Sequence, residues 1–339
     1  IRRPPRSTLS SSSAASDVYK RQILCCVMYK HVLHDHLDGG LRPSTAKELA
    51  ESINYKPLLD IDNVESFFDR SSSDSLEEYL EAFTHTIALM QNYSSIERIA
   101  FEAAEDMHLN GINFYESRYA PFYSVNNEMT PLDVIDAVNS GFKIAENTYG
   151  IRSGLILCGM RHDTKDVVNV ANLCLEAKDK IIGFDIAGPE LNFPPSLFRE
   201  SFKKVKELGV NITIHAGEGD GVNSIIDALD NGAMRIGHGV RIIEDINNNK
   251  PGETAKKIIE QQIPLEVCIT SNIHTNMYEN FDSHPIVDLI ALGFNVYLNT
   301  DNRLMSNTSI SKELEIAKSL GIENVENLLK YSASDSFFD

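Results

Sequence analysis

The sequence predicts an α/β protein built from eight strands that alternate with helices. Short apolar runs rich in β-branched residues recur along the chain, and the segments between them are long enough for helices. From the second strand onward these runs start roughly 30 residues apart, the length of one strand–helix unit. Eight such units favour a (β/α)8 TIM barrel over an open, doubly wound sheet. The expected strands are residues 29–36, 112–119, 151–158, 181–186, 211–215, 235–238, 264–269 and 294–300.

Several of the intervening segments carry helix boundary signals. Thr130 followed by Pro131 is typical of an N-cap and a first helical residue, and Gly150 is expected to end that helix. Residues 201–208 and 254–262 place apolar side chains three and four positions apart, as the buried face of a helix requires. Helices of this kind would cover the outside of the barrel.

The first strand–helix unit is much longer than the others. Residues 75–78, Ser-Leu-Glu-Glu, resemble a capping box ahead of an amphipathic run that ends at Met90. The active site of such a barrel lies at the carboxyl ends of the strands, so a helical insertion after strand 1 would lie over its mouth. The insertion would act either as a lid over a substrate or as a stabilising addition. Phe67 and Phe68 would accordingly gate the entrance or belong to the core.

Composition and charge restrict the class of protein. The chain has 339 residues, 42% hydrophobic and 24% charged, which is typical of a folded protein. Its formal net charge of -18 argues against nucleic-acid or anionic-membrane partners, because binding phosphates requires a cationic face. No apolar run approaches the roughly 20 residues of a membrane-spanning helix. The five cysteines are odd in number and scattered, which argues against a disulfide framework or thiolate metal site and favours a reducing, cytoplasmic location.

The first residues of the chain differ from the rest. Residues 1–22 are rich in serine and basic residues and show no periodicity. The apolar run that follows is short for a signal peptide, and no cleavage site of small residues comes after it. We therefore interpret residues 1–27 as a disordered, non-native leader, and residues 28–339 as a single barrel domain whose C-terminus is truncated.

Candidate metal ligands stand at the ends of the predicted strands. In His34-Asp35-His36 the two imidazoles would face one side of a strand and Asp35 the other, since alternate residues share a face. Two histidines at this spacing provide half of a metal site, although the pattern alone is weak. Strand 5 ends with His215 and strand 8 with Asp301, which would complete a set of three imidazoles and one carboxylate.

Two further side chains would face the same mouth. Gly217 lets the chain turn so that Glu218 reaches back over the site, and the glycines around His238 leave space for a ligand. Three histidines and one aspartate without thiolates suit Zn²⁺, with other divalent transition metals possible. Strand 4 offers no lysine that could bridge two metals, so we expect one Zn²⁺ per chain.

Seven short motifs follow one another within residues 29–306, in the order HDHLDGG, RYAP, GFDIAGPE, HAGE, RIGHG, EVCITSN and NTDNRLMS. Together they resemble the adenosine deaminase family, within the superfamily of metal-dependent hydrolases. The succession of HAGE, GHG and TD is highly specific as a set. The zinc deaminases that act on bases in nucleic acids are unrelated, and their HxE and PCxxC signature is absent.

The resemblance implies a reaction and assigns roles in it. Hydroxide would attack C6 of adenosine or 2′-deoxyadenosine while Glu218 protonates N1, giving inosine or 2′-deoxyinosine and ammonia. His238 would orient or deprotonate the attacking water and stabilise its negative charge. The proton donor makes chemical sense, because an aromatic amine leaves only if the ring accepts charge, and a desolvated site would keep Glu218 protonated. The zinc ligands implied are His34, His36, His215 and Asp301.

The resemblance also implies substrate contacts. The peptide N–H of Gly188 matches the family's donor to purine N3, and Asp38 matches the residue that contacts the ribose 5′-hydroxyl. Relatives acting on adenine or futalosine-type nucleosides often carry Glu there, so Asp38 favours adenosine or 2′-deoxyadenosine. Many members have Asp at the place of Asn302, whose amide can still donate to purine N7, although base selectivity stays open. Asp185 and Ser271 would orient ligands or serve only the structure.

Three alternatives remain open. Another aminohydrolase on the same scaffold would act on adenine, a modified adenine nucleoside or AMP, with AMP disfavoured because no basic cluster accompanies the motifs. A non-catalytic nucleoside-binding relative would have lost a ligand or the acid. A metal-dependent ester or amide hydrolase would favour two metals. The expected partner is a small-molecule purine nucleoside, and the oligomeric state stays open. His162 could face the pocket, whereas His31, His85, His108, His274 and His284 are expected at the surface or as satisfied core residues.

Overall fold

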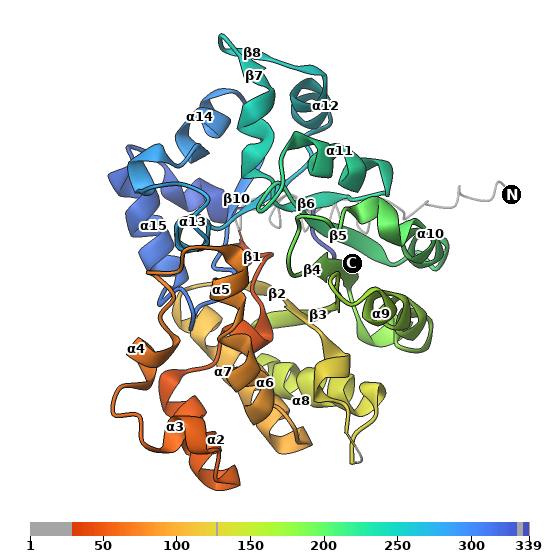
Figure 1. Cartoon of the computed structure of the whole chain (residues 1–339), viewed down its shortest axis with the longest axis vertical. Coiled ribbons are helices and arrows are strands. Elements are labelled where there is room, and N and C mark those ends of the chain that lie inside the picture. The colour runs from red at the N-terminus through yellow and green to blue at the C-terminus, as the bar shows by residue number, and fades with distance from the viewer. Residues whose placement is uncertain (1–28, 127, 331–334, 339) are drawn as a thin grey trace, which may run out of the picture.

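The computed structural model describes residues 29–126, 128–330 and 335–338. Eight parallel strands form one sheet in the order β1-β2-β3-β4-β5-β6-β9-β10, with helices around it (Figure 1). A parallel bridge between Asp35 and Asp301 joins the chain beyond β1 to the chain beyond β10. This bridge brings the two edges together, so the predicted (β/α)8 barrel is confirmed. The strands are β1 (His31–Val32), β2 (Phe114–Tyr119), β3 (Arg152–Met160), β4 (Gly183–Ala187), β5 (Asn211–Ala216), β6 (Arg235–His238), β9 (Leu265–Val267) and β10 (Val296–Leu298).

The first strand is shorter than the sequence predicts. Regular pairing in β1 covers two residues, and beyond it the backbone N–H groups of Leu33 and His34 donate to Oδ1 of Asn299. A side-chain oxygen thus replaces a strand partner at this point, and parallel pairing resumes at Asp35 and His36. The sequence pattern also does not predict a small hairpin, β7 (Ile246–Asn247) and β8 (Lys250–Pro251), outside the barrel.

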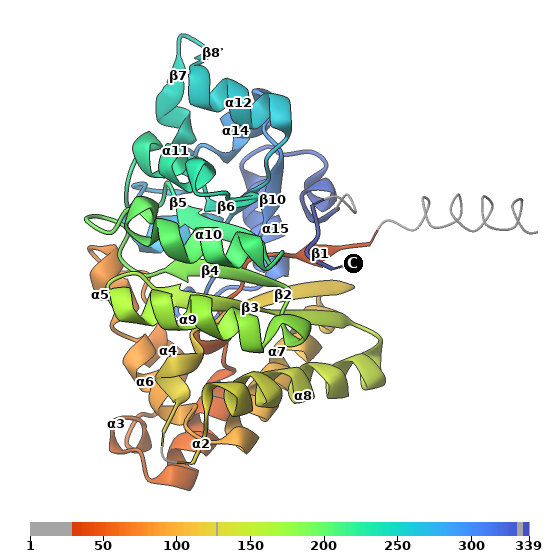
Figure 2. The ribbon, with the colours of Figure 1, turned by 90° about the vertical axis from the view of Figure 1, so that its right-hand side faces the viewer.

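The helices between the strands, and α15 after the last strand, surround the sheet (Figure 2). Thr130 and Asp133 form a reciprocal capping box at the start of α8, and Gly150 ends that helix with φ of 76°, as predicted. Gly141 lets α8 approach α7 closely, because a Cβ there would collide with the backbone of Glu97. These helices are α7 (Tyr93–Leu109), α8 (Pro131–Tyr149), α9 (Thr164–Glu176), α10 (Arg199–Glu207), α11 (Val222–Asp230), α12 (Glu253–Gln261), α13 (Ile269–His274), α14 (Ile286–Ala291) and α15 (Ile310–Ser319).

The insertion between β1 and α7 consists of short helices. Ser75 caps α5 by accepting a hydrogen bond from the N–H of Glu78, but the carboxylate of Glu78 accepts from Asp74, so only half of the predicted capping box forms. The amphipathic run predicted to end at Met90 is interrupted between α5 and α6. The inserted helices are α2 (Pro43–Ile53), α3 (Lys56–Leu59), α4 (Val64–Phe68), α5 (Leu76–Leu80) and α6 (Phe83–Leu89).

The two phenylalanines of α4 belong to the core. Phe68 is fully buried, and the ring of Phe67 packs edge-on against it and against His85. Neither lines the main pocket, which α5 and α6 cover instead. The part of the insertion that lies over the mouth is therefore α5 and α6.

The described residues form one barrel with its helical insertion and a continuous hydrophobic core. In this part of the chain, no helix is long and apolar enough to cross a membrane. The predicted leader, residues 1–27, lies outside the described residues.

Candidate metal centre and substrate pocket

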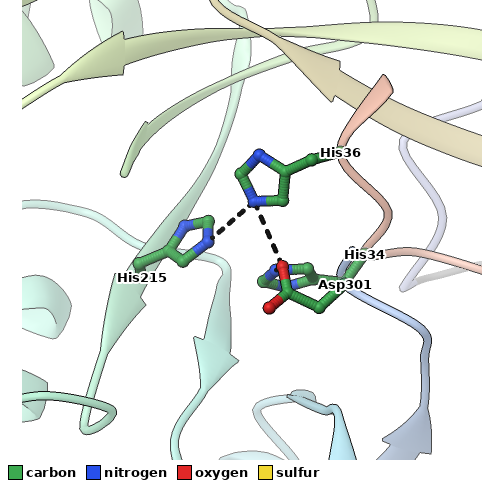
Figure 3. A group of neighbouring side chains, drawn as sticks. All are labelled: His34, His36, His215 and Asp301. Atoms are coloured by element: carbon green, nitrogen blue, oxygen red, sulfur yellow. Dashed lines mark hydrogen bonds and ion pairs between the residues drawn. The ribbon is translucent and has the colours of Figure 1, made fainter. Parts of the chain in front are cut away.

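Three imidazoles and one carboxylate converge at the carboxyl ends of β1, β5 and β10 (Figure 3). Nε2 of His36 lies 3.1 Å from Nε2 of His215, and Oδ1 of Asp301 lies 3.3 Å from Nε2 of His34 and 3.4 Å from Nε2 of His36. Ligands at 2.0–2.1 Å from a tetrahedral zinc ion lie roughly 3.3 Å from one another. These distances, and a separation of no more than 4.8 Å between any two of the four ligand atoms, fit one metal ion held by all four side chains.

The barrel closure positions three of these candidate ligands directly. The N–H of His36 donates to the carbonyl of Asp301, and the N–H of Asp301 donates to the carbonyl of His34. As predicted from the alternation of a strand, the side chain of Asp35 points away from the two imidazoles. It accepts hydrogen bonds from Tyr115 and other residues on the opposite side.

The ligand atoms are selected by hydrogen bonds to their neighbours. Nδ1 of His34 lies 3.0 Å from a carboxylate oxygen of Glu266, and Nδ1 of His215 lies 2.8 Å from Asp185. Each contact leaves Nε2 as the nitrogen that faces the cluster. Ser271 donates to Oδ2 of Asp301 at 2.6 Å, which leaves Oδ1 for the cluster.

The charge state of the cluster favours a cation. Burial opposes ionisation of Asp301, but its hydrogen bond with His34 and the imidazoles around it hold its pKa well below the usual range. Burial lowers the pKa of His36 and of His215. Only His34 has a raised pKa, because hydrogen bonds to Asp301 and Glu266 outweigh burial. Its Nε2 is fully buried and lies 3.3 Å from Oδ1 of Asp301, a separation that fits two atoms bound to one metal ion.

A buried charge network lies beneath these side chains, and of its members the sequence analysis named only Asp185, as a residue that would orient a ligand. Arg118 donates to Asp185 at 2.5 Å and to Glu266 at 2.8 Å, while Arg235 donates to Glu266 and Glu116 at 2.7 Å each. All five side chains lie inside the barrel and are 0–1% exposed. Their signal in the sequence was a set of charged residues within apolar strands, as in FYESRY.

Glu218 and His238 lie beside the ligand cluster, as the resemblance implies. Oε2 of Glu218 is 3.6 Å from Nε2 of His238. Burial, reinforced by the charges of Asp301 and Glu190, raises the pKa of Glu218 well above its usual range. Glu190 itself, another residue missed in the sequence, accepts the backbone N–H groups of residues 217, 218 and 220, and so fixes the turn that carries Glu218.

The backbone is unusual at two positions of the site. His238 has φ of 60° and Asp301 has φ of 57°, in the left-handed region that residues other than glycine rarely adopt. Such conformations persist where the surrounding structure holds them, and they are concentrated at functional sites. Here they aim both side chains into the mouth of the barrel.

The cluster forms one end of a pocket covered by the insertion. Helices α5 and α6 form an apolar cover over the pocket, and no lysine or arginine is among the described residues that line the pocket. The cover comprises Leu76, Tyr79, Leu80, Phe83 and Ile87.

The three predicted substrate-binding residues also line this pocket. Gly188 has φ of 92°, and a Cβ there would lie 3.1 Å from Nδ1 of His162, which also lines the pocket. Burial raises the pKa of Asp38 to about 7, and its Oδ1 lacks a hydrogen-bond partner among the described residues. Oδ1 of Asn302 is likewise buried without one, and the side chain packs against Gly39.

One histidine that was expected at the surface or as a satisfied core residue lies close to His238. His284 is 4% exposed, and its Nε2 lies 3.1 Å from Oδ1 of Asn272, whose Nδ2 is 3.0 Å from Nδ1 of His238. The sequence carries no local signal for this contact, because the three residues lie on separate elements.

A (β/α)8 barrel with three histidines and an aspartate converging beside a buried acid defines the class of metal-dependent hydrolase barrels. The sequence profile of the family described as "Adenosine deaminase" matches residues 30–339. "Adenosine deaminase 1" of Streptomyces coelicolor is 42% identical over 301 residues, covering 84% of this chain and 76% of that protein. The adenosine deaminase of Mycobacterium ulcerans is 40% identical over 300 residues, covering 84% and 83%.

Solved structures share the fold. Adenine deaminase from Arthrobacter aurescens superposes with a TM-score of 0.83 at 23% identity, covering 92% of this chain and 95% of that chain. The N6-mAMP deaminase of Arabidopsis superposes with a TM-score of 0.78 at 28% identity, covering 92% and 94%. The chain therefore belongs to the adenosine deaminase family, and it is an enzyme, a metal-dependent hydrolase that acts on C–N bonds.

Proposed function

We propose that the protein hydrolyses adenosine and 2′-deoxyadenosine to inosine or 2′-deoxyinosine and ammonia, with one zinc ion per chain. The observation that carries this proposal is the arrangement of the mouth. A metal-ligand set, the buried acid Glu218 and a pocket lined by Asp38 meet at one place. The curated relatives named adenosine deaminase support the same substrate class.

Zinc suits the donor set of imidazoles and a carboxylate without thiolates. When bound, a zinc ion lowers the pKa of a water molecule toward about 7, so that a nucleophile is available at neutral pH. A second group of possible ligand atoms, Glu218, His238 and Asp301, would need an ionised Glu218, but burial raises the pKa of Glu218 well above its usual range, which supports one ion per chain over two. The residues that would hold the ion are His34, His36, His215 and Asp301.

The side chains around the cluster supply the proton transfers. Glu218, protonated because it is buried, gives its proton to N1 of the purine as the oxygen of a water molecule bonds to C6. His238 stabilises the attacking oxygen through Nε2. The C6–N bond then breaks. One proton of the water goes to the amine, which leaves as ammonia, and the other returns to the Glu218 carboxylate, so that the ring keeps the oxygen as its 6-oxo group.

The pocket residues would orient the nucleoside. The N–H of Gly188 donates to N3, the amide of Asn302 donates to N7, and the carboxylate of Asp38 accepts from the ribose 5′-hydroxyl. The unpartnered buried oxygen of Asp38 supports this assignment, because a buried acceptor without a partner is costly until a ligand donates to it. The apolar cover formed by α5 and α6 would act as the lid and exclude water from the purine ring.

The structural relatives suggest a second group of candidate substrates, adenine and its nucleotides. The Arabidopsis relative is named for N6-mAMP, a nucleotide, and the Arthrobacter relative for adenine, a free base. A 5′-phosphate would meet the carboxyl of Asp38 in a pocket whose described lining offers no lysine or arginine, so a nucleotide fits poorly. Free adenine would leave Asp38 without a partner. The nucleoside is therefore the better fit.

The test is to incubate the purified protein with adenosine and to follow inosine and ammonia, in zinc-replete and chelated samples. Adenine, AMP and 2′-deoxyadenosine are run alongside, and metal content is measured in the same preparations. We expect zinc-dependent conversion of both nucleosides and one zinc ion per chain. Conversion of adenine or AMP in preference would move the substrate to the second class, and zinc binding without any deamination would favour a nucleoside-binding relative.

A cytoplasmic location stays part of the proposal. Its support is that Cys158, Cys174 and Cys268 are buried and free, as expected for a protein kept in a reducing compartment.

A further inference from the structure

A chain of hydrogen bonds that begins at a backbone amide ends at His238. The N–H of Ile286, in the first turn of α14, donates to Nδ1 of His284 at 3.2 Å. A backbone N–H can only donate, so Nδ1 of His284 accepts and carries no proton. Burial lowers the pKa of His284 to about 3, so the ring is neutral and its proton lies on Nε2.

The second link fixes the orientation of an amide. Nε2 of His284 lies 3.1 Å from Asn272, and because this nitrogen donates, the atom facing it must be the amide oxygen. The reversed amide would place two donors against each other. Asn272 is fully buried and His284 is 4% exposed, so the two groups depend on each other for hydrogen bonding.

The third link determines the proton of His238. With its oxygen facing His284, Asn272 directs its NH₂ group at Nδ1 of His238, 3.0 Å away. Nδ1 of His238 therefore accepts, and the proton of the neutral ring lies on Nε2. That nitrogen is buried and has no hydrogen-bond partner within the described residues, and it lies 3.6 Å from Glu218 at the pocket.

We propose that Asn272 and His284 are positioning residues that hold His238 as its Nε2–H tautomer, so that His238 donates a hydrogen bond to the attacking oxygen and does not remove its proton. The sequence analysis left open whether His238 orients or deprotonates the attacking water, and this chain of hydrogen bonds selects orientation. The catalytic consequence rests on the proposed deamination. The tautomer itself follows from the protein alone, because each link is set by the donor before it.

The tautomer can be measured without any reaction. Protein labelled with ¹⁵N-histidine gives two-bond ¹H–¹⁵N correlation spectra that distinguish the two neutral tautomers from the imidazolium. Comparison with His238→Gln assigns the signals of His238, in metal-free and in zinc-loaded protein. We expect the Nε2–H form in both samples. An Nδ1–H form or an imidazolium near neutral pH would overturn the proposal, whether or not the enzyme deaminates adenosine.

Asn272→Asp is the most informative variant, since aspartate has nearly the size of asparagine but its carboxylate can only accept hydrogen bonds. It would accept from His284 and from His238, which must then carry its proton on Nδ1. In the Ser-His-Asp triad, holding histidine in the wrong tautomer lowers kcat about 10⁴-fold. We expect His238 to switch tautomer here and kcat to fall between about 10²- and 10⁴-fold, with KM for adenosine little changed.

Asn280→Asp is the matched control. Asn280 is exposed and caps a turn by accepting from the N–H of Ser283, which a carboxylate can also do, so the same substitution should leave the tautomer and kcat unchanged. A switched tautomer in Asn272→Asp with kcat retained would overturn the catalytic role. If Asn272→Asp does not fold, His284→Phe releases the amide of Asn272, and a mixture of His238 tautomers is expected. A single unchanged tautomer in His284→Phe would remove His284 from the mechanism.

The design separates two failures. A wild-type protein that leaves adenosine unchanged but shows the Nε2–H form contradicts the proposed function and supports the tautomer assignment. Deamination of adenosine with the Nδ1–H form contradicts only the assignment.

Discussion

The pKa values of buried carboxyl groups are shifted in opposite directions on the two sides of the site. On the floor, below the imidazoles, burial opposes ionisation of Glu266 and Asp185, yet neighbouring arginine and histidine charges hold their pKa values well below the usual range. On the wall that faces the pocket, burial raises the pKa of Glu218 well above its usual range and that of Asp38 to about 7. All four are buried, so what differs is the presence of a paired cation.

The difference separates two tasks. Ionised carboxylates on the floor lie 3.0 Å from Nδ1 of His34 and 2.8 Å from Nδ1 of His215, and so orient these two imidazoles. Among the described residues, no lysine or arginine forms an ion pair with Glu218 or Asp38, which makes these carboxyl groups available to exchange a proton or a hydrogen bond with a substrate. Variants of the floor should therefore change metal binding and stability, whereas variants of the wall should change turnover and substrate affinity.

The largest effect is expected for a ligand itself. His215→Ala should lose the metal and reduce turnover by more than about 10⁴-fold, since the nucleophile depends on the bound ion. Metal content after gel filtration and adenosine turnover measure the two losses together. His162→Ala is the control, because His162 lines the same pocket outside the ligand cluster and its variant should keep the metal. A His215→Ala protein that retains one equivalent of zinc would place the metal elsewhere.

Glu218→Gln tests the wall and should keep the metal. Removing the proton donor is expected to lower kcat about 10²- to 10⁴-fold, because the ring can no longer be protonated as the oxygen attacks. In the wild type, the rate should fall as pH rises through the raised pKa of Glu218, and this alkaline decline should be absent from the variant. Stopped assays across pH, with metal content measured in parallel, give both results. Full activity in Glu218→Gln would eliminate Glu218 as the donor.

Glu266→Gln tests the floor. The substitution removes a charge that pairs with both Arg118 and Arg235, and breaking a buried pair typically costs about 3–5 kcal/mol. We expect the free energy of unfolding to fall by that order, measured by denaturant titration. Glu244→Gln breaks a partly exposed pair with Arg241 and should change stability by no more than about 1 kcal/mol. Equal losses in the two variants would mean that the floor network contributes nothing special.

The sequence predicted that the candidate ligands converge, because barrel geometry places them together. A side chain at the carboxyl end of a parallel strand faces the mouth, so apolar runs ending in His34, His215, His238 or Asp301 were sufficient to bring these residues together. The spacing of His34 and His36 on one face survives in the structure even though regular pairing in β1 ends earlier. Local rules about strands thus determined most of the site.

The supporting residues could not be predicted in the same way. Arg118 contacts Glu266 across 148 positions of the chain, and a charged residue inside an apolar strand does not reveal its partner. The link from His284 through Asn272 to His238 joins the segment before α14, helix α13 and the end of β6, which no local pattern of the sequence relates to one another. The predicted continuation of the helix to Met90 failed for a related reason, since tertiary packing over the pocket divides that run into α5 and α6.

The smallest effect is expected at Asp38, where the wall meets the ribose. With a pKa of about 7, this carboxyl gains a proton as pH falls, and a neutral carboxyl accepts a hydrogen bond less strongly than a carboxylate. The value of kcat/KM for adenosine should therefore rise as pH increases through about 7. Asp38→Asn should raise KM for adenosine about tenfold and remove this pH dependence, as expected for loss of one charge-assisted hydrogen bond.

5′-Deoxyadenosine provides the control for Asp38, because it lacks the hydroxyl that the carboxylate is proposed to accept from. Wild type and Asp38→Asn should use it with similar kcat/KM, and neither should show the rise through pH 7. If Asp38→Asn instead weakens both substrates equally, the carboxyl acts on the shape of the pocket and not on the 5′-hydroxyl. The wall would then owe its selectivity to the cover formed by α5 and α6, whose apolar side chains contact a purine whatever sugar it carries.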